Sequence, residues 1–308
     1  MINFNQNTAV VFPGQGSQTV GMGKDLFENS ENAKLIFKEV DETLGRNLSD
    51  IIFNGSQEEL NRTENAQPAI AATSLACFAV FKDKYPKFNA FSTAGHSLGE
   101  YTSLSASGTL SVSDTISLVS ERGRLMQIAC EENPGGMVAL IGLDLNTVEE
   151  VCREAGAYTS NINSEQQIII SGDNNSLAIA VDLAKARGAK KAIKLKVSGA
   201  FHSILMEPAR DSLIEFIDSL NFKDPQIPVI GNVKAKPLIS SSDIKNELID
   251  QLMSCVQWNN TIKYMSSNGC EQFIEFGPGK VLSGLIKRIN SDCEIHNIDS
   301  LESLSVKS

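Results

Sequence analysis

A strand, a glycine-bracketed turn and a helix follow one another around residue 97, and this order constrains the fold more than any other feature. Residues 89–94 predict a short strand, Gly95–Gly99 matches G-x-S-x-G, and a helical pattern continues to about Ser107. In such an elbow the central serine adopts strained backbone geometry and projects its hydroxyl from the end of a sheet. The alternative is an ordinary glycine-rich turn. We interpret Ser97 as a nucleophile at the N-terminus of a helix.

Apolar strands and amphipathic helices alternate along the 308 residues, which predicts an α/β fold with a mainly parallel sheet. The middle of the chain has the order βαββαβ, typical of a ferredoxin-like domain, and turn-like residues flank it at 133–136 and 198–199. We therefore expect a small domain at 131–198. It would be inserted into a large α/β-hydrolase-like domain formed by 1–130 and 199–308.

Charge and composition exclude several classes of function. A net charge of -10 argues against binding to nucleic acid or to an anionic membrane, and no apolar run approaches the length of a membrane span. The N-terminal residues lack the basic and apolar segments of a signal peptide. The six cysteines are scattered and the three histidines are far apart, so we expect no disulfide framework and no metal site. These features favour a cytoplasmic protein.

A nucleophilic serine needs a base, and only three histidines are available. His96 adjoins Ser97 on a tight turn and would project in a different direction, and His296 lies near the C-terminus with no motif around it. His202 follows a predicted strand and turn and precedes a helix, so it can reach the same sheet edge. We therefore expect His202 to be the general base.

Two backbone N–H groups are the expected donors to an oxyanion. The segment Phe12–Gln18 follows the first predicted strand and contains two glycines, which let backbone N–H groups approach a ligand. A tetrahedral intermediate needs two such donors. We assign them to Gln15 and to Leu98, the residue after the nucleophile; the alternative for Phe12–Gln18 is an ordinary turn.

Arg122 lies on the apolar face of the helix predicted at Asp114–Cys130. A buried guanidinium without a partner is unfavourable, so an anion should meet it. The anion is either an internal carboxylate or the carboxylate of a substrate, to which arginine donates two parallel hydrogen bonds. From the helix alone we favour the internal salt bridge.

Together these residues resemble the malonyl-CoA:acyl carrier protein transacylases of fatty acid synthesis. The resemblance covers nearly the whole chain, and its motifs are Phe12–Gln18, Gln67–Ala69, Gly95–Glu100, Arg122–Gly123, Gly199–His202, Val256–Trp258 and Glu275–Leu282. The sequence departs from the family at Cys255, where proline is common, and at Glu165 and Gln166 in the small domain.

The resemblance implies a function and a set of site residues. Ser97 would carry a malonyl ester, with His202 as its base and a backbone carbonyl near Gln257 orienting the imidazole. Arg122 would bind the malonyl carboxylate, Gln67 would line the pocket, and Phe201 would favour malonyl over methylmalonyl. The reaction would need no cofactor, because malonyl-CoA is a substrate.

The expected protein partner is acyl carrier protein, which is acidic, and we expect the chain itself to be a monomer. Two basic groups predict a docking face for an acidic partner. They are Lys185, Arg187, Lys190, Lys191, Lys194 and Lys196, and Lys280, Lys287 and Arg288. For any single lysine, a solvated surface is an equally good interpretation.

Three other functions remain open. A serine esterase or thioesterase shares the elbow, the serine and the histidine, but gives no reason for Arg122 on an apolar face. A non-catalytic carrier-binding module would not need both Ser97 and His202. An acyltransferase with another acyl group, such as a polyketide or polyunsaturated fatty acid loading enzyme, is the third.

Overall fold

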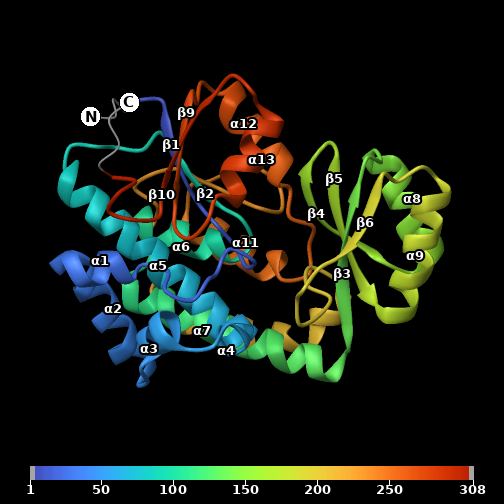
Figure 1. Cartoon of the computed structure of the whole chain (residues 1–308), viewed down its shortest axis with the longest axis horizontal. Helices are drawn as coiled ribbons and strands as arrows, with labels where there is room; N and C mark the ends of the chain where they lie inside the picture. The colour runs from blue at the N-terminus through green and yellow to red at the C-terminus, as the bar shows by residue number, and fades with distance from the viewer. Residues whose placement is uncertain (1–3, 305–308) are drawn as a thin grey trace.

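The computed structural model describes residues 4–304 and consists of a large and a small part lying side by side (Figure 1). The large part contains a six-stranded sheet in the order β10-β9-β1-β2-β7-β8, in which only β7 and β8 pair antiparallel. Its strands are β1 (Thr8–Phe12), β2 (Thr93–Gly95), β7 (Val229–Ile230), β8 (Pro237–Leu238), β9 (Gln272–Phe276) and β10 (Glu294–Ile298). The predicted α/β fold with a mainly parallel sheet is confirmed.

Helices cover both faces of this sheet. Alternate residues of β1 enter different cores: Val10 and Phe12 join the larger core, whereas Ala9 and Val11 join the other. The helices of the large part are α1 (Lys24–Asn29), α2 (Glu31–Leu44), α3 (Leu48–Asn54), α4 (Gln57–Asn61), α5 (Thr63–Lys84), α6 (Leu98–Ala106), α7 (Val112–Glu132), α10 (Arg210–Ser219), α11 (Ser241–Gln251), α12 (Trp258–Ser267) and α13 (Val281–Ile289). Burial on both faces explains why β1 is apolar from Ala9 to Phe12.

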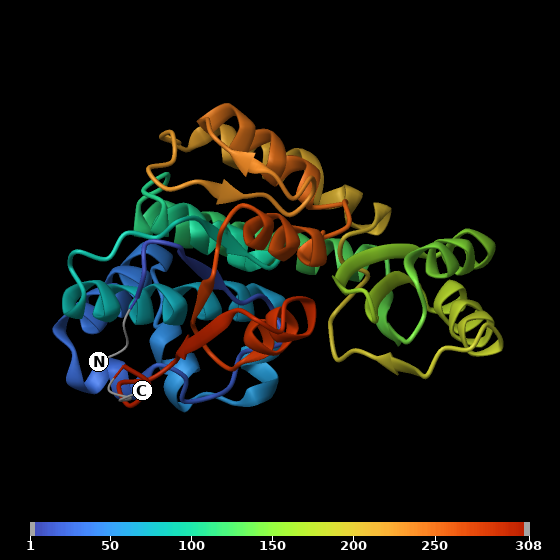
Figure 2. The same ribbon diagram turned by 90° about the horizontal axis from the view of Figure 1, so that it is seen from above.

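The small part has the predicted βαββαβ order, and its antiparallel sheet runs β4-β5-β3-β6. Its elements are β3 (Gly135–Ile141), α8 (Leu145–Ala155), β4 (Tyr158–Ser164), β5 (Gln167–Asp173), α9 (Asn174–Ala186) and β6 (Lys191–Lys194). Seen from above, both helices lie on the side of this sheet that faces away from the large part (Figure 2). Strand β4 is tied back to the large part, because the N–H of Ile162 donates to the carbonyl of Val256 over 2.9 Å.

Several predicted boundaries were wrong for identifiable reasons. The sequence predicts a helix over 70–82, whereas α5 begins two turns earlier, at Thr63, and contains Pro68. The sequence also predicts Ser113 as the N-cap of the next long helix, but the N-cap of α7 is Ser111, which accepts from the N–H of Asp114. The helix predicted over 204–220 is a 3-10 turn (Ile204–Ala209) followed by α10, because Pro208 lacks the N–H that a continuous α-helix needs.

None of the helices within residues 4–304 is long and apolar enough to cross a membrane.

Candidate active site

Ser97 lies on a tight elbow between β2 and α6, with φ of 51° and ψ of -106°. The flanking positions, 95 and 99, have no room for a side chain, so only glycine fits there. A Cβ on Gly95 would lie 1.8 Å from the carbonyl carbon of Gly99, and a Cβ on Gly99 would lie 2.0 Å from the carbonyl oxygen of Phe12. The strand and helix therefore pack closely enough to force the strained serine conformation, as the sequence pattern predicts.

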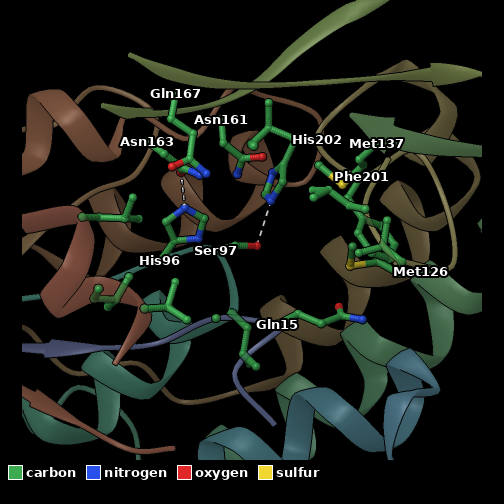
Figure 3. A pocket seen from close by; sticks show the side chains of 18 of the residues that line it. Gln15, His96, Ser97, Met126, Met137, Asn161, Asn163, Gln167, Phe201 and His202 are labelled. Carbon is green, nitrogen blue, oxygen red and sulfur yellow. Dashed lines mark hydrogen bonds between the residues drawn. The ribbon is translucent and has the colours of Figure 1, made fainter. Parts of the chain in front are cut away.

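His202 meets the serine directly. Its Nε2 lies 2.7 Å from Ser97 Oγ (Figure 3). Its Nδ1 lies 2.9 Å from the backbone carbonyl oxygen of Gln251. A carbonyl can only accept, so Nδ1 carries the proton and Nε2 is free to accept from the serine. The backbone of His202 also has a positive φ, 57°. Both members of the dyad therefore sit in unfavourable backbone geometry, which is common at functional sites.

Burial, followed by the positive charge of Arg122, lowers the pKa of His202 from 6.5 to about 3. The imidazole is therefore neutral at neutral pH and can act as a base towards Ser97. Burial also lowers the pKa of His96. His96 turns away from the nucleophile, as expected, and its Nε2 lies 2.8 Å from Asn163 Oδ1 of the small part.

Arg122 is 1% exposed and its guanidinium reaches the nucleophile. Its Nη2 donates to Ser97 Oγ over 3.2 Å and to Gln251 Oε1 over 2.9 Å, and its Nη1 donates to Gln67 Oε1 over 2.6 Å. These three acceptors are neutral oxygens. The internal salt bridge favoured from the helix alone was therefore wrong, and the positive charge at Ser97 is available to an anionic ligand.

A cavity of about 170 Å³ lies between the two parts, with Ser97 and His202 in its wall. Apolar side chains face it from several elements, among them Met126, Met137 and Phe201 (Figure 3). The small part adds polar groups from β4 and β5, namely Asn161, Asn163 and Gln167. The cavity can thus hold a short, partly polar group against the serine.

Two backbone segments of the large part meet beside Ser97. The N–H of His96 donates to the carbonyl of Phe12 over 3.0 Å, and a Cβ on Gly14 would lie 2.4 Å from the carbonyl oxygen of His96. This contact brings Gln15 and Leu98 into the same cavity wall as Ser97. Leu98 is the first residue of α6, where a backbone N–H has no partner within the helix.

The chain is similar to acyltransferases over nearly its whole length. Residues 9–302 match the family described as acyl transferase domain. A malonyl CoA-acyl carrier protein transacylase of Bacillus subtilis is 46% identical over 289 residues, which is 92% of this chain and 90% of that protein. The chain belongs to the malonyl-CoA:acyl carrier protein transacylase family.

Solved structures agree with this family assignment. The acyl-carrier-protein-S-malonyltransferase of Bartonella henselae superposes with a TM-score of 0.93 at 41% identity, covering 96% of each chain. A malonyl-transacylase in complex with a type II polyketide acyl-carrier protein has a TM-score of 0.93 at 38% identity, covering 96% of this chain and 97% of its own.

Two residues carried over from the family lie elsewhere than expected. The carbonyl that accepts from Nδ1 of His202 over 2.9 Å belongs to Gln251, at the end of α11. The N–H of Gln257 instead donates to the carbonyl of Asn232 over 2.7 Å at the start of α12. Gln67 is fully buried and lies outside the cavity wall, where it supports Arg122 from behind. Gln67 therefore does not line the cavity as expected, and the main carbonyl partner of His202 lies earlier in the chain than the expected position near Gln257.

Sequence reasoning missed Gln251, which contacts Ser97, His202 and Arg122. A signal was present. In α11, Gln251 shares the buried face of Ile244 and Leu248, the same kind of misplaced polar residue that drew attention to Arg122. Asn232 was also missed, and it had no comparable signal because it lies outside any regular element.

Proposed function

We propose that this chain transfers a malonyl group from malonyl-CoA to the phosphopantetheine thiol of acyl carrier protein, through an ester on Ser97, and so supplies fatty acid synthesis. The observation that carries the proposal is the buried guanidinium of Arg122, which lies 3.2 Å from Ser97 Oγ and has no carboxylate at ion-pair distance within residues 4–304. This arrangement favours an acyl group that ends in a carboxylate. The relatives named above, which are malonyl transacylases, support the same activity.

In the first half-reaction, His202 takes the proton of Ser97 as Oγ attacks the thioester carbonyl. Arg122 gives up its hydrogen bond to Ser97 Oγ and donates to the malonyl carboxylate instead. The protonated imidazole then gives its proton to the sulfur of CoA, which leaves. In the second half-reaction His202 deprotonates the carrier thiol, which attacks the ester and restores the serine.

The oxyanion of each tetrahedral intermediate would accept from the N–H groups of Gln15 and Leu98. Both residues border the cavity beside Ser97, and the hydrogen bond between His96 and Phe12 keeps their two segments together. Backbone donors fixed in this way need no rearrangement when the charge develops.

Phe201 would limit the size of the acyl group. It is 5% exposed, lies next to the base in the chain, and borders the cavity with Met126 and Met137. A methyl branch on the malonyl group would have to displace this packed ring, which is unfavourable in a dense interior. We therefore assign malonyl as the preferred substrate over methylmalonyl.

The two basic groups predicted from the sequence support docking of an acidic carrier protein. Lys194 and Lys196 are exposed next to Leu195 and Val197, which border the cavity, and Lys280 precedes the cavity residue Val281. Positive charge thus lies on two sides of the cavity. In the first group, however, Arg187 already pairs with Glu154 at 2.5 Å and contributes less.

The proposed enzyme acts as a monomer in the cytoplasm. Ser97, His202 and Arg122 all come from one chain, so the site is complete without a second copy. Its proposed location follows the cysteine pattern and the bacterial transacylases to which the chain is similar.

A transfer assay distinguishes this function from that of a serine thioesterase, which shares the dyad. The protein is incubated with malonyl-CoA and phosphopantetheinylated carrier protein, and malonyl-carrier protein and free malonate are both quantified. We expect malonyl-carrier protein as the main product and none with Ser97→Ala. Free malonate as the main product would contradict the proposal and favour a hydrolase.

A further inference from the structure

Glu100 is a buried carboxyl group directly behind the nucleophile that the mechanism above does not use. It is the last residue of the motif Gly95–Glu100, lies in the first turn of α6 and is 0% exposed. One of its oxygens accepts from the backbone N–H of Asn232 over 2.8 Å, and the other accepts from Nε2 of Gln251 over 2.5 Å. It does not border the cavity, so it cannot touch a bound acyl group.

Gln251, one of the two partners of Glu100, forms hydrogen bonds with Ser97, Arg122 and His202. Its Nε2 also donates to the carbonyl of Ser97 over 2.9 Å, its Oε1 accepts from Arg122 over 2.9 Å, and its backbone carbonyl accepts from His202. Both hydrogens of its amide nitrogen are therefore used on one side, and its oxygen faces the guanidinium on the other.

Asn232, the other partner, fixes the strained elbow. Its Oδ1 accepts from the N–H of Ser97 over 2.8 Å, and its Nδ2 donates to the carbonyl of Gly95 over 2.7 Å. Asn232 is itself 0% exposed and lies just after β7. The side chain of Asn232 thus forms hydrogen bonds with one backbone N–H and one backbone carbonyl of the turn.

We propose that Glu100 is a positioning residue that sets the orientation of the Gln251 amide, and through it the placement of Arg122 at Ser97. A carboxylate only accepts, whereas an amide has one donating and one accepting end. While Glu100 accepts, Nε2 of Gln251 must face it and Oε1 must face Arg122. A flipped amide would point two N–H groups at the guanidinium and push it from the serine. This inference rests on the proposed function, because its consequence is the placing of a substrate carboxylate.

Glu247 is a second buried carboxyl group beside Glu100 and offers a matched control. It lies within hydrogen-bonding reach of Glu100 and accepts from the N–H of Val233 over 2.6 Å. Burial and the neighbouring Glu247 raise the pKa of Glu100, and burial raises the pKa of Glu247. Both oxygens of Glu100 face N–H donors, so the group is placed as an acceptor. Glutamine at position 247 keeps an oxygen for the N–H of Val233, whereas glutamine at position 100 turns an N–H group towards Asn232 or Gln251.

The test compares Glu100→Gln and Glu247→Gln with the wild type. Single-turnover formation of the acyl-enzyme is measured with malonyl-CoA and with acetyl-CoA, and Tm verifies that each variant is folded. We expect Glu100→Gln to lower the malonyl rate about 100-fold, as for a reacting group displaced by about 1 Å, and to lower the acetyl rate less. Glu247→Gln should keep the wild-type rates and the wild-type malonyl preference.

Gln251→Ala provides a second test of the same interaction if Glu100→Gln does not fold. It keeps the backbone carbonyl that His202 needs and removes the amide, so it should lose the malonyl preference in the same way. The double variant should be no worse than the more impaired single variant, since both changes remove one interaction.

Three results would overturn the role of Glu100. They are an unchanged malonyl preference in Glu100→Gln or in Gln251→Ala, an equal loss in Glu247→Gln, and additive losses in the double variant. Absence of an acyl-enzyme in the wild type is a distinct result, which would overturn the proposed function and this inference with it.

Discussion

In the proposed function, the choice of acyl group depends on Arg122. Its guanidinium is buried, and the oxygens of Gln67, Gln251 and Ser97 hold it without neutralising its charge. Such a group gains most when an anion joins it, because the low-dielectric surroundings weaken the attraction little. A neutral acyl group gains nothing comparable from the same contact.

Replacing Arg122 with alanine should therefore separate two substrates. We expect kcat/KM for malonyl-CoA to fall about 100-fold or more, as when one partner of a buried charge pair is removed, and that for acetyl-CoA to fall far less. Arg124→Ala is the control, since Arg124 lies on the same helix in an exposed pair with Glu121. Equal losses for the two substrates would contradict a carboxylate-binding role.

Because His202 is the proposed general base, we expect its pKa to set the pH range of the reaction. Because burial and Arg122 lower this pKa from 6.5 to about 3, the imidazole stays a neutral base well into acid. We expect kcat/KM for malonyl-CoA, which reports the free enzyme, to lose no base function between about pH 8 and about pH 5. An inflection near the ordinary value of histidine, absent from acid unfolding, would contradict this.

The same shift links His202 to stability. Above the unfolded pKa both states carry a neutral ring, so the full stability is present. As the pH falls from 6.5 towards about 3, only the unfolded chain takes up the proton, and stability is lost. Replacing His202 with glutamine should therefore flatten the fall of Tm over this range, and an unchanged slope would contradict the buried neutral imidazole.

At this scale, sequence alone identified residues whose chemistry is local or conspicuously misplaced. The glycine-bracketed turn predicts Ser97, and the position of Arg122 on an apolar helix face singles out that residue. His202 was found by elimination among three histidines. The carbonyl of Gln251 was not predictable, because every residue has a carbonyl and only the folded end of α11 brings this one to the imidazole.

The elbow between β2 and α6 positions Ser97, and its glycines are needed because a side chain at either position would clash with the backbone. Gly99→Ala would place a Cβ 2.0 Å from the backbone oxygen of Phe12, so β1 and α6 would have to separate. We expect a loss of about 3 kcal/mol or more in the free energy of unfolding. Wild-type stability in this variant would contradict the close packing.

Gly284 offers a matched control on another helix. A Cβ there meets nothing within 4 Å, and the residue lies in the middle of α13. Alanine has the higher helix propensity, so Gly284→Ala should raise stability by about 0.5–1 kcal/mol. Denaturant unfolding of both variants measures the contrast, and destabilisation by Gly284→Ala would refute it.

Elements were predictable where periodicity and end signals agree. The sequence predicts helices over 31–44 and 281–289 and a strand over 272–276. These bounds match α2, α13 and β9, because each is a strongly patterned segment with clear ends. By contrast, α1, α3, α4 and the edge strand β10 were missed: the three helices are short, and β10 has exposed or half-buried residues without a clear alternation.

At the scale of the whole molecule, the cavity exists only because a small antiparallel part is held against the large one. Segments 195–197 and 281–285 border this cavity from the two parts, and both carry exposed lysines nearby. The charge pattern was visible in the sequence, but its position around the cavity follows from the packing of the two parts.

Charge reversal at Lys194 and Lys196 should therefore weaken docking without affecting the first half-reaction. We expect KM for carrier protein to rise about tenfold at low salt and the effect to shrink as salt screens it, while malonylation of Ser97 stays unchanged. Reversal at Lys34 and Lys38, on the distant helix α2, is the control. An unchanged KM would remove this surface from the docking site.

Intact mass spectrometry of the protein tests the central claim most directly. The protein is mixed with malonyl-CoA, its mass is recorded, and phosphopantetheinylated carrier protein is then added. We predict one malonyl adduct, absent from Ser97→Ala, that persists until the carrier arrives and then reappears on the carrier. An adduct that water removes before the carrier is added, or no adduct at all, would contradict a malonyl transfer through Ser97.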